Sequence, residues 1–361
     1  MGKRLMVIGL SAVFVLSGVA VSAGAPATGP LAQVIEGAKK EGTVSVVLRT
    51  GFTPSSMERL RKEIKEKFGA DLDIKFSPSE YMPKELAQAI MEQKVGAPPS
   101  RDLITFMDTQ VAQGMKAGVF ERVDWKSLIT PDMNPEVVCE EPLVRGAIVY
   151  FSAYIGTIYN PNKVSADKAP KTLRELADPK WRGNVGVFNY TATWARWALV
   201  LGKEKVLNEL RAILKNGAIQ GRFADLSNRY LLGEISVCFI NSGYFKEVKD
   251  KGMPTAWQHL DLAEIQNFTA VVRQGAKHPN AAKLLALYLA SPAGAKFTLD
   301  EAGSGTVYYP GNYEHDIRVQ AKRQGIREIS IDRNLLEFSI SKEGAQLEKE
   351  LKLVFDTGGE R

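Results

Sequence analysis

The sequence predicts an α/β protein built as two lobes. The chain has 361 residues, and about 335 remain after an N-terminal export segment, which is long for a single hydrophobic core. Short apolar β-like runs alternate with amphipathic helical runs, as in a largely parallel sheet covered by helices on both faces. The composition, 45% hydrophobic and 24% charged, is that of an ordinary globular protein.

The N-terminal part predicts three strands, each followed by a helix. The first strand covers 43–48 and ends at Arg49. The first helix has Thr53 as its N-cap, apolar residues at helical spacing, and Gly69 as its stop. The later elements keep the same order: strand 72–78, helix 82–96, strand 102–107 and helix 109–120.

The chain changes character at 130–146, an irregular, proline-bearing segment that we expect to cross between the lobes. Residues 147–160 form an apolar run long enough for a strand that changes partners. A second αβ series and a polar, helical C-terminal segment complete the chain. Its elements are strands 185–189, 236–241 and 268–275, and helices 191–202, 206–217 and 278–291. No fixed-period repeat occurs, which excludes solenoids and propellers.

Residues 1–25 have the pattern of a cleaved export signal. A basic start at 3–4 precedes an apolar run at 5–21, and small residues offer cleavage near Ala23 or Ala25. An uncleaved membrane anchor is the alternative. We find no other run of roughly 18 apolar residues, so we expect the mature chain to be a soluble periplasmic protein.

Charge and cysteine content exclude several classes of protein. The formal charge of +6 falls to +4 once Lys3 and Arg4 are removed, and the basic residues are mixed with acidic ones, as in 58–69. This pattern is typical of a solvated helix face, so we expect no nucleic-acid partner. Cys139 and Cys238 are too few for a cysteine-rich metal site. An oxidising compartment would permit a disulfide between them, but two free thiols remain the alternative.

Four segments carry a family resemblance, and they occur in order along the chain. They are "AKKEGTVSVV" (38–47), "MEQKVGAPPSRDLITF" (91–106), "IGTIYNPNKV" with "PKTLRELADPKWRGNVGV" (155–187), and "GAKHPNAAKLLALYLASPAGAKF" (275–297). In this combination the chain resembles the periplasmic solute-binding proteins of ABC importers, and within them the ferric iron-binding-like subfamily.

The resemblance implies a type II periplasmic-binding-protein fold, with two α/β lobes around a central ligand cleft. Lobe 1 would combine 30–143 with 266–312, and lobe 2 would combine 146–262 with 313–361. Such a protein captures a small solute by hinge closure and delivers it to a permease in the inner membrane. We expect a monomer that needs no cofactor.

The candidate ligand-binding residues lie mainly in loops that join a strand to a helix. They are Arg49, Thr50, Gly51, Phe52, Tyr81, Asn189, Tyr190, Thr191, Thr193, Asn241, Ser242 and Tyr244. Helix N-termini in such loops favour an anion, and the guanidinium of Arg49 could hold a carboxylate or phosphate through two hydrogen bonds. We therefore expect an anionic, organic-acid-like solute. A surface ion pair of Arg49, and simple capping by Thr191, are the alternatives.

Ferric iron is the alternative cargo. Relatives that bind it usually have a tyrosine cluster with an adjacent Tyr-Tyr pair, whereas here Phe245 follows Tyr244. Fe(III) prefers phenolate and carboxylate oxygen, so the loss of a tyrosine matters. If iron is bound, the candidate ligands are Glu80, Tyr81 and Tyr244; otherwise we expect no metal.

Enzyme motifs are missing. The histidines at 259, 278 and 315 are scattered, and neither an HExxH nor a G-x-S-x-G motif occurs. Ser304, between two glycines, lacks a convincing base and is expected to form a turn beside the cleft. We therefore do not expect an enzyme. A secreted hydrolase, or a chemosensory protein that presents its ligand to a membrane receptor, is the alternative from another class.

Overall fold

One mixed sheet runs through the whole molecule in the computed structural model, which describes residues 29–49, 51–79 and 81–360. The ten strands of the described residues are β1 (Thr43–Leu48), β2 (Asp73–Pro78), β3 (Leu103–Met107), β4 (Ile148–Tyr159), β5 (Val185–Phe188), β6 (Ile219–Gly221), β7 (Val237–Asn241), β8 (Ala256–Gln258), β9 (Ala263–Val272) and β10 (Glu328–Ile329). Neighbours follow the order β2-β1-β3-β9-β4-β7-β5-β6, while β10 pairs with β9 and β8 with β4. We call β1 to β3 with their helices the first half, and β5 to β7 with theirs the second half.

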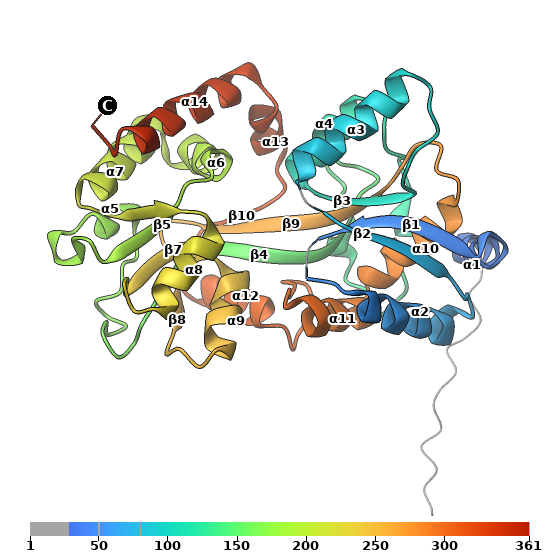
Figure 1. The fold of residues 1–361 in the computed structure, drawn as a ribbon, viewed down its shortest axis with the longest axis horizontal. Coiled ribbons are helices and arrows are strands. Elements are labelled where there is room, and N and C mark those ends of the chain that lie inside the picture. The colour runs from blue at the N-terminus through green and yellow to red at the C-terminus, as the bar shows by residue number, and fades with distance from the viewer. Residues whose placement is uncertain (1–28, 50, 80, 361) are drawn as a thin grey trace, which may run out of the picture.

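The sheet is parallel at its two ends and antiparallel in the middle. β1 pairs in parallel with β2 and β3, and β5 pairs in parallel with β6 and β7. The pairs β3–β9, β9–β4 and β4–β7 are antiparallel. Apart from the short parallel pair β10–β9, the parallel sheet predicted from strand–helix alternation is found only within each half, because β4 and β9 run between the halves in opposite directions. Figure 1 shows these two strands passing through the centre of the molecule.

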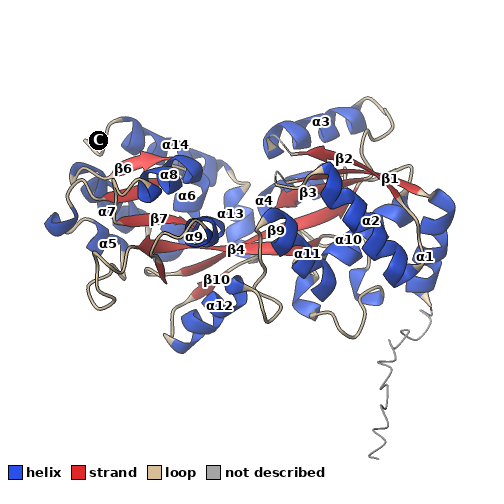
Figure 2. Cartoon of the chain, turned by 60° about the horizontal axis from the view of Figure 1, so that its bottom comes forward, coloured by secondary structure: helices blue, strands red, loops and turns tan. Residues whose placement is uncertain are grey.

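Helices cover the faces of the sheet in both halves (Figure 2). The first half has α1 (Pro30–Glu41), α2 (Pro54–Phe68), α3 (Met82–Lys94), α4 (Asp108–Lys116), α10 (Pro279–Leu289) and α11 (Pro292–Ala302). The second half has α5 (Leu173–Leu176), α6 (Thr191–Leu201), α7 (Lys203–Lys215), α8 (Phe223–Leu231), α9 (Ser242–Asp250) and α14 (Lys342–Asp356). Helix α12 (Tyr313–Arg323) packs on β4, and α13 (Arg333–Ser339) contacts both α4 and α6. Three short 3-10 helices lie at Trp125–Ser127, Pro135–Val137 and Pro179–Trp181.

Strand β4 makes the passage from one half to the other. It pairs with β9 from Ile148 to Ile155 and with β7 from Ile155 to Tyr159, so it changes partners as predicted. All of its residues are buried. The preceding segment, 130–146, was expected to cross; instead it folds back on the start of β4, where Val138 bridges Ile148.

Local sequence signals explain most of the boundaries. Thr53 caps α2 by accepting a hydrogen bond from the Ser56 N–H at 3.2 Å, and Gly69 ends that helix at a φ of 67°, which only glycine adopts readily. The predicted strand 43–48 coincides with β1. These predictions are confirmed.

Strand β9 begins five residues before its predicted start at 268. Its first part contains Glu264, Gln266 and Asn267, which are polar yet buried. Each finds a polar partner: Glu264 accepts a hydrogen bond from the Trp197 Nε1–H, and the amides of Gln266 and Asn267 bond other side chains. An apolar pattern cannot predict a strand whose buried side chains are satisfied in this way.

The predicted export segment 1–25 and the candidate residues Thr50 and Glu80 lie outside the described residues. The predicted lobe boundaries remain a prediction, since β4 and β9 belong to the sheet of both halves. No described helix is long and apolar enough to cross a membrane.

Candidate functional site

A cavity of about 1050 Å³ opens between the two halves, above the crossing strands. The starts of α3, α4, α6, α9 and α12, the central parts of β4 and β9, and the end of α11 all contribute to its wall. This volume lies just above the range of about 300–1,000 Å³ that is usual for small-molecule sites. Both its position and its size suit the capture of a small solute.

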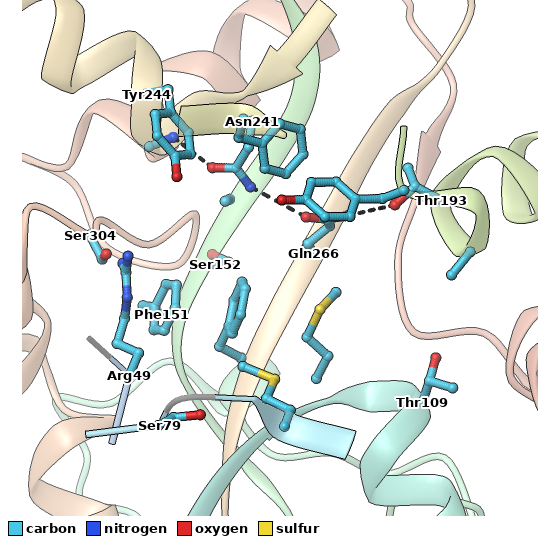
Figure 3. A pocket seen from close by; sticks show the side chains of 18 of the residues that line it. Arg49, Ser79, Thr109, Phe151, Ser152, Thr193, Asn241, Tyr244, Gln266 and Ser304 are labelled. Carbon is cyan, nitrogen blue, oxygen red and sulfur yellow. Dashed lines mark hydrogen bonds between the residues drawn. The ribbon is translucent and has the colours of Figure 1, made fainter. Parts of the chain in front are cut away.

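Arg49 extends into the cavity from the end of β1. Its Cζ atom lies 5.0 Å from the centre of the Phe151 ring, close enough for a cation–π contact. Figure 3 shows the two side chains together, with Ser304 on the same side of the cavity. Within the described residues, no carboxylate pairs with this guanidinium. Its hydrogen-bonding groups are therefore available to a ligand.

A β-bulge sets the floor of the cavity. The register between β4 and β9 shifts after Val149, so that Phe151 rather than Tyr150 lies opposite Phe268. The rings of Phe151 and Phe268 stack at 4.1 Å with an interplanar angle of 11°. The cavity thus has a flat aromatic floor beside the Arg49 cation.

A chain of hydrogen bonds lines the wall on the second-half side (Figure 3). The Asn241 amide donates to Gln266 Oε1 at 3.3 Å, and the Gln266 amide donates to Thr193 Oγ1 at 3.2 Å. Asn241 Oδ1 also accepts from the Gly243 N–H at 2.8 Å, which caps α9. These bonds fix polar groups from three elements in one surface.

Eight of the predicted ligand-binding residues line this single cavity: Arg49, Tyr81, Asn189, Tyr190, Thr191, Thr193, Asn241 and Tyr244. They come from parts of the chain nearly two hundred residues apart, so the loops chosen from the sequence do meet in space. The Thr191 hydroxyl does not cap its helix but donates to Glu348 Oε2 at 3.1 Å.

Three other predicted residues lie behind the wall or beside it. Phe52 is buried and stacks on Phe297 at 5.6 Å, and Gly51 packs against Ala302. Ser242 is fully buried and donates a hydrogen bond to the carboxyl group of Glu314. Their positions are those of supporting residues, and none of the three lines the cavity.

Glu314 is a buried acid in the cavity wall that the sequence did not point to. Burial raises the pKa of its carboxyl group to about 8, against the hydrogen bonds from Ser242 and Tyr313 that lower it. Glu314 therefore carries a proton over much of the neutral range and contributes little negative charge to the cavity.

A buried ion network ties the two halves together below the cavity. Arg196 of α6 lies 3.2 Å from Asp108 Oδ1, at the start of α4, and 3.2 Å from Glu264 Oε1 on β9. Trp197 donates to the other oxygen of Glu264 at 2.6 Å. Since Asp108 belongs to the first half and Arg196 to the second, this network links the two halves at the base of the cavity.

Several lining residues were missed by the sequence analysis. Thr109 is the second residue after β3, at the start of α4, so the strand-to-helix signal that found Arg49 applied to it as well. Phe151 and Gln266 lie within strands, and no local signal says which face of a strand meets a cavity. Ser304 was predicted only as a turn beside the cleft, and it does line the cavity.

The structure also bears on metal binding and on the state of the two cysteines. No group of three or more His, Cys, Asp or Glu side chains that could hold a metal ion occurs in the described part of the chain. Cys139 and Cys238 are both buried free thiols, and burial raises the pKa of each. The sequence left open either a disulfide or two free thiols, and in the structure both cysteines are free.

Two α/β halves joined by crossing strands around a solute-sized cavity define a binding protein of the type II class. The chain belongs to the family of bacterial extracellular solute-binding proteins, which matches residues 63–314. Members of this class are substrate-binding proteins of ABC transporters and not enzymes, which confirms the predicted family, fold class and absence of enzymatic activity.

Solved structures with the same fold include proteins with different cargoes. Iron-bound HitA from Pseudomonas aeruginosa is 18% identical with a TM-score of 0.64, over 86% of this chain and 99% of that one. The spermidine/putrescine-binding protein PotD from Streptococcus pneumoniae is 14% identical with a TM-score of 0.68, over 88% and 99%. A Trichodesmium FutA with iron and citrate is 14% identical with a TM-score of 0.63, over 89% and 100%. At this identity the likeness concerns the fold.

Proposed function

We propose that this protein captures a small anionic solute, of the organic-acid or phosphate type, and delivers it to an ABC permease in the inner membrane. Arg49 is the observation that carries the proposal. Its guanidinium lies in the cavity on the ring of Phe151, and no carboxylate of the described residues neutralises it. A planar guanidinium held in this way suits two parallel hydrogen bonds to a carboxylate or phosphate.

Three of the four acidic side chains that line the cavity are neutral or paired, and the fourth, Glu348, accepts a hydrogen bond from Thr191. Glu314 is held neutral by its raised pKa. At the rim, Asp250 pairs with Lys246, and Glu247 pairs with Lys251 at 2.6 Å. The starts of several helices add partial positive charge to the wall, which favours an anion further.

The fold supports capture by closure of the two halves. They share β4 and β9, so a small bend in these strands would bring the walls together around a solute. In the closed form the protein would dock on its permease. The segment 1–25, whose pattern predicts export, would place it in the periplasm.

The decisive substitution is Arg49→Ala. Hydrogen bonds to charged groups contribute about 1.5–3 kcal/mol each, so we expect affinity for small carboxylates and phosphates to fall by at least about tenfold. Arg49→Lys should retain part of the affinity, because it keeps the charge but loses the planar fork. The measurement is calorimetric titration of metal-stripped protein, after a thermal-shift screen of organic acids, phosphonates, amines, thiamine and Fe(III).

Arg182→Ala provides the matched control, since Arg182 is exposed and does not line the cavity. It should bind as the unmodified protein does. Stabilisation by cationic amines alone, or an Arg49→Ala protein with unchanged affinity for anions, would rule out the proposal.

Ferric iron is a second candidate, favoured by the phenol groups in the cavity. Tyr81 and Tyr244, two of the predicted iron ligands, line it together with Tyr190 and Tyr313. Burial raises the pKa of Tyr244 and of Tyr313, which works against the phenolate form that Fe(III) requires. A tyrosinate–iron absorption band on adding Fe(III), lost in Tyr244→Phe, would favour iron over an anion.

A further inference from the structure

Two aromatic rings face the same cavity from opposite halves of the molecule. Tyr81 is 63% exposed and Tyr190 is 40% exposed, and no other aromatic side chain of the described residues is classed as exposed. Both line the cavity. Tyr81 precedes α3 in the first half, and Tyr190 precedes α6 in the second. The two most exposed rings are therefore gathered at one site.

Helix capping does not explain why either of these positions has a tyrosine. Both tyrosines stand at N-cap positions, and neither makes a side-chain capping bond. Serine, threonine, aspartate or asparagine would stabilise a helix at this position by about 1 kcal/mol more than a residue that cannot cap. The chain thus carries an aromatic ring, at some cost in stability, at two helix starts that meet across the cavity.

Further rings extend the surface around Tyr190. Its ring lies 4.7 Å from that of Phe223, which lies 5.7 Å from that of Tyr244, and all three line the cavity. The stacked pair Phe151 and Phe268 forms the floor next to Arg49. A ligand between these surfaces meets flat, apolar faces on the floor and on the second-half wall. Of the cations that line the cavity, Arg196 and Lys246 are paired with carboxylates, and Arg49 has no carboxylate partner among the described residues.

We propose that the solute is an aromatic acid, with its acid group on Arg49 and its ring held against Tyr190 and its neighbours and covered by Tyr81. This inference rests on the proposed function for the acid group and extends it to the body of the ligand. Offset or edge-to-face contacts between aromatic rings add stability beyond the burial of area. Closure would bring Tyr81 onto the ring that Tyr190 already contacts.

Four carboxylates of graded structure test the inference in calorimetric titrations at constant ionic strength. Phenylacetate has both an acid group and a ring, cyclohexylacetate has a ring of similar size without a π face, and acetate is the acid alone. Glycine betaine replaces the ring with a cation, which aromatic rings can also bind. We expect phenylacetate to bind about tenfold more tightly than cyclohexylacetate or glycine betaine, and acetate to bind most weakly.

Substitutions of the two tyrosines test whether their rings cause the preference for phenylacetate over acetate. Tyr81→Ala and Tyr190→Ala should each reduce the ratio of phenylacetate to acetate affinity by about five- to tenfold, while Tyr→Phe at either position should keep it. Leu232→Ala is the control, because Leu232 is exposed but does not line the cavity. Equal binding of phenylacetate and cyclohexylacetate, tighter binding of glycine betaine, or alanine variants with an unchanged ratio would overturn the inference.

The same titrations distinguish the proposed capture of an anion by Arg49 from the inference that the solute is aromatic. If Arg49→Ala weakens every carboxylate but the tyrosine variants change nothing, the anion site stands and the aromatic inference fails. If the tyrosine variants lower phenylacetate affinity but Arg49→Ala does not, the acid group is held elsewhere and the proposed function fails at its central residue.

Discussion

Glu314 places a carboxyl group in the wall of the cavity, fully buried, with hydroxyl groups rather than a cation beside it. Ser242 of α9 and Tyr313 of its own helix are its side-chain partners, and the backbone of Tyr154 in β4 also lowers its pKa. Both tyrosines have raised pKa values and stay protonated at neutral pH. Glu314 is therefore the group in this cluster whose charge changes near neutrality.

The raised pKa of Glu314 makes the stability of the folded protein depend on pH. The pKa of Glu314 is about 8 in the folded protein, against an ordinary value of 4.5. Between these values the folded state holds a proton that the unfolded state has lost, so the free energy of unfolding falls as pH rises, by about 1.4 kcal/mol per pH unit from this group alone. Glu314→Gln should remove this slope, as measured by urea unfolding at pH 6.5, 7.25 and 8.

The pH range is chosen to avoid His259. Burial lowers the pKa of this histidine to about 4, so its contribution changes between about 4 and 6.5 and has the opposite sign. Glu58→Gln, at an exposed position, is the control and should keep the wild-type pH dependence. Parallel profiles for wild type and Glu314→Gln would mean that the carboxyl group is already ionised at neutral pH.

At the scale of elements, Arg196 connects three parts of the fold: α6, the start of α4 and strand β9. Its two carboxylate partners, Asp108 and Glu264, are almost completely buried. Burial raises the pKa of Glu264, which shows that this environment favours the uncharged form of an acid. The arginine therefore compensates two charges that could not otherwise remain in the interior.

Replacing Arg196 with methionine keeps an unbranched, though shorter, side chain and removes the charge. We expect a loss of roughly 3–5 kcal/mol in the free energy of unfolding, because both carboxylates are left buried without a cation. Arg229→Met is the matched control: Arg229 pairs with Glu234 at 2.7 Å on the exposed surface, and its loss should cost less than about 1 kcal/mol. Equal losses in urea unfolding would show that the Arg196 network adds no stability.

The residues around the cavity show which features of the site could be predicted from the sequence and which could not. Arg49 could be predicted because its signal is local: an apolar strand, then a cation and a glycine. Its contact with Phe151 could not, since the two are about a hundred residues apart and the facing of Phe151 depends on the bulge at Tyr150. Phe52 looked equivalent to Arg49 in the same loop but packs on Phe297, because a loop pattern does not say which side chains point inward.

On the scale of the whole molecule, the cavity walls belong to two halves that share the middle of the sheet and are also linked by α13 and by the Arg196–Asp108 ion pair. The first-half wall carries Arg49 and Tyr81, and the second-half wall carries Tyr190 and the Asn241–Gln266–Thr193 bonds. A solute held by Arg49 alone would leave the second wall uncontacted. If the halves close as proposed, contacts with the second wall would add binding energy, and a ligand that contacts both walls would shift the population toward the closed form.

Small-angle X-ray scattering can measure this closure. A compact chain of this length has a radius of gyration of about 20 Å, and two halves held apart by an open cavity should exceed it. We expect saturating carboxylate ligand to reduce the radius of gyration of the wild-type protein toward that value. The Arg49→Ala protein should show no change at the same ligand concentration, because it lacks the group that starts binding. A radius of gyration that stays constant while calorimetry shows full occupancy would mean that the solute binds to halves already fixed by the Arg196 network, without hinge movement.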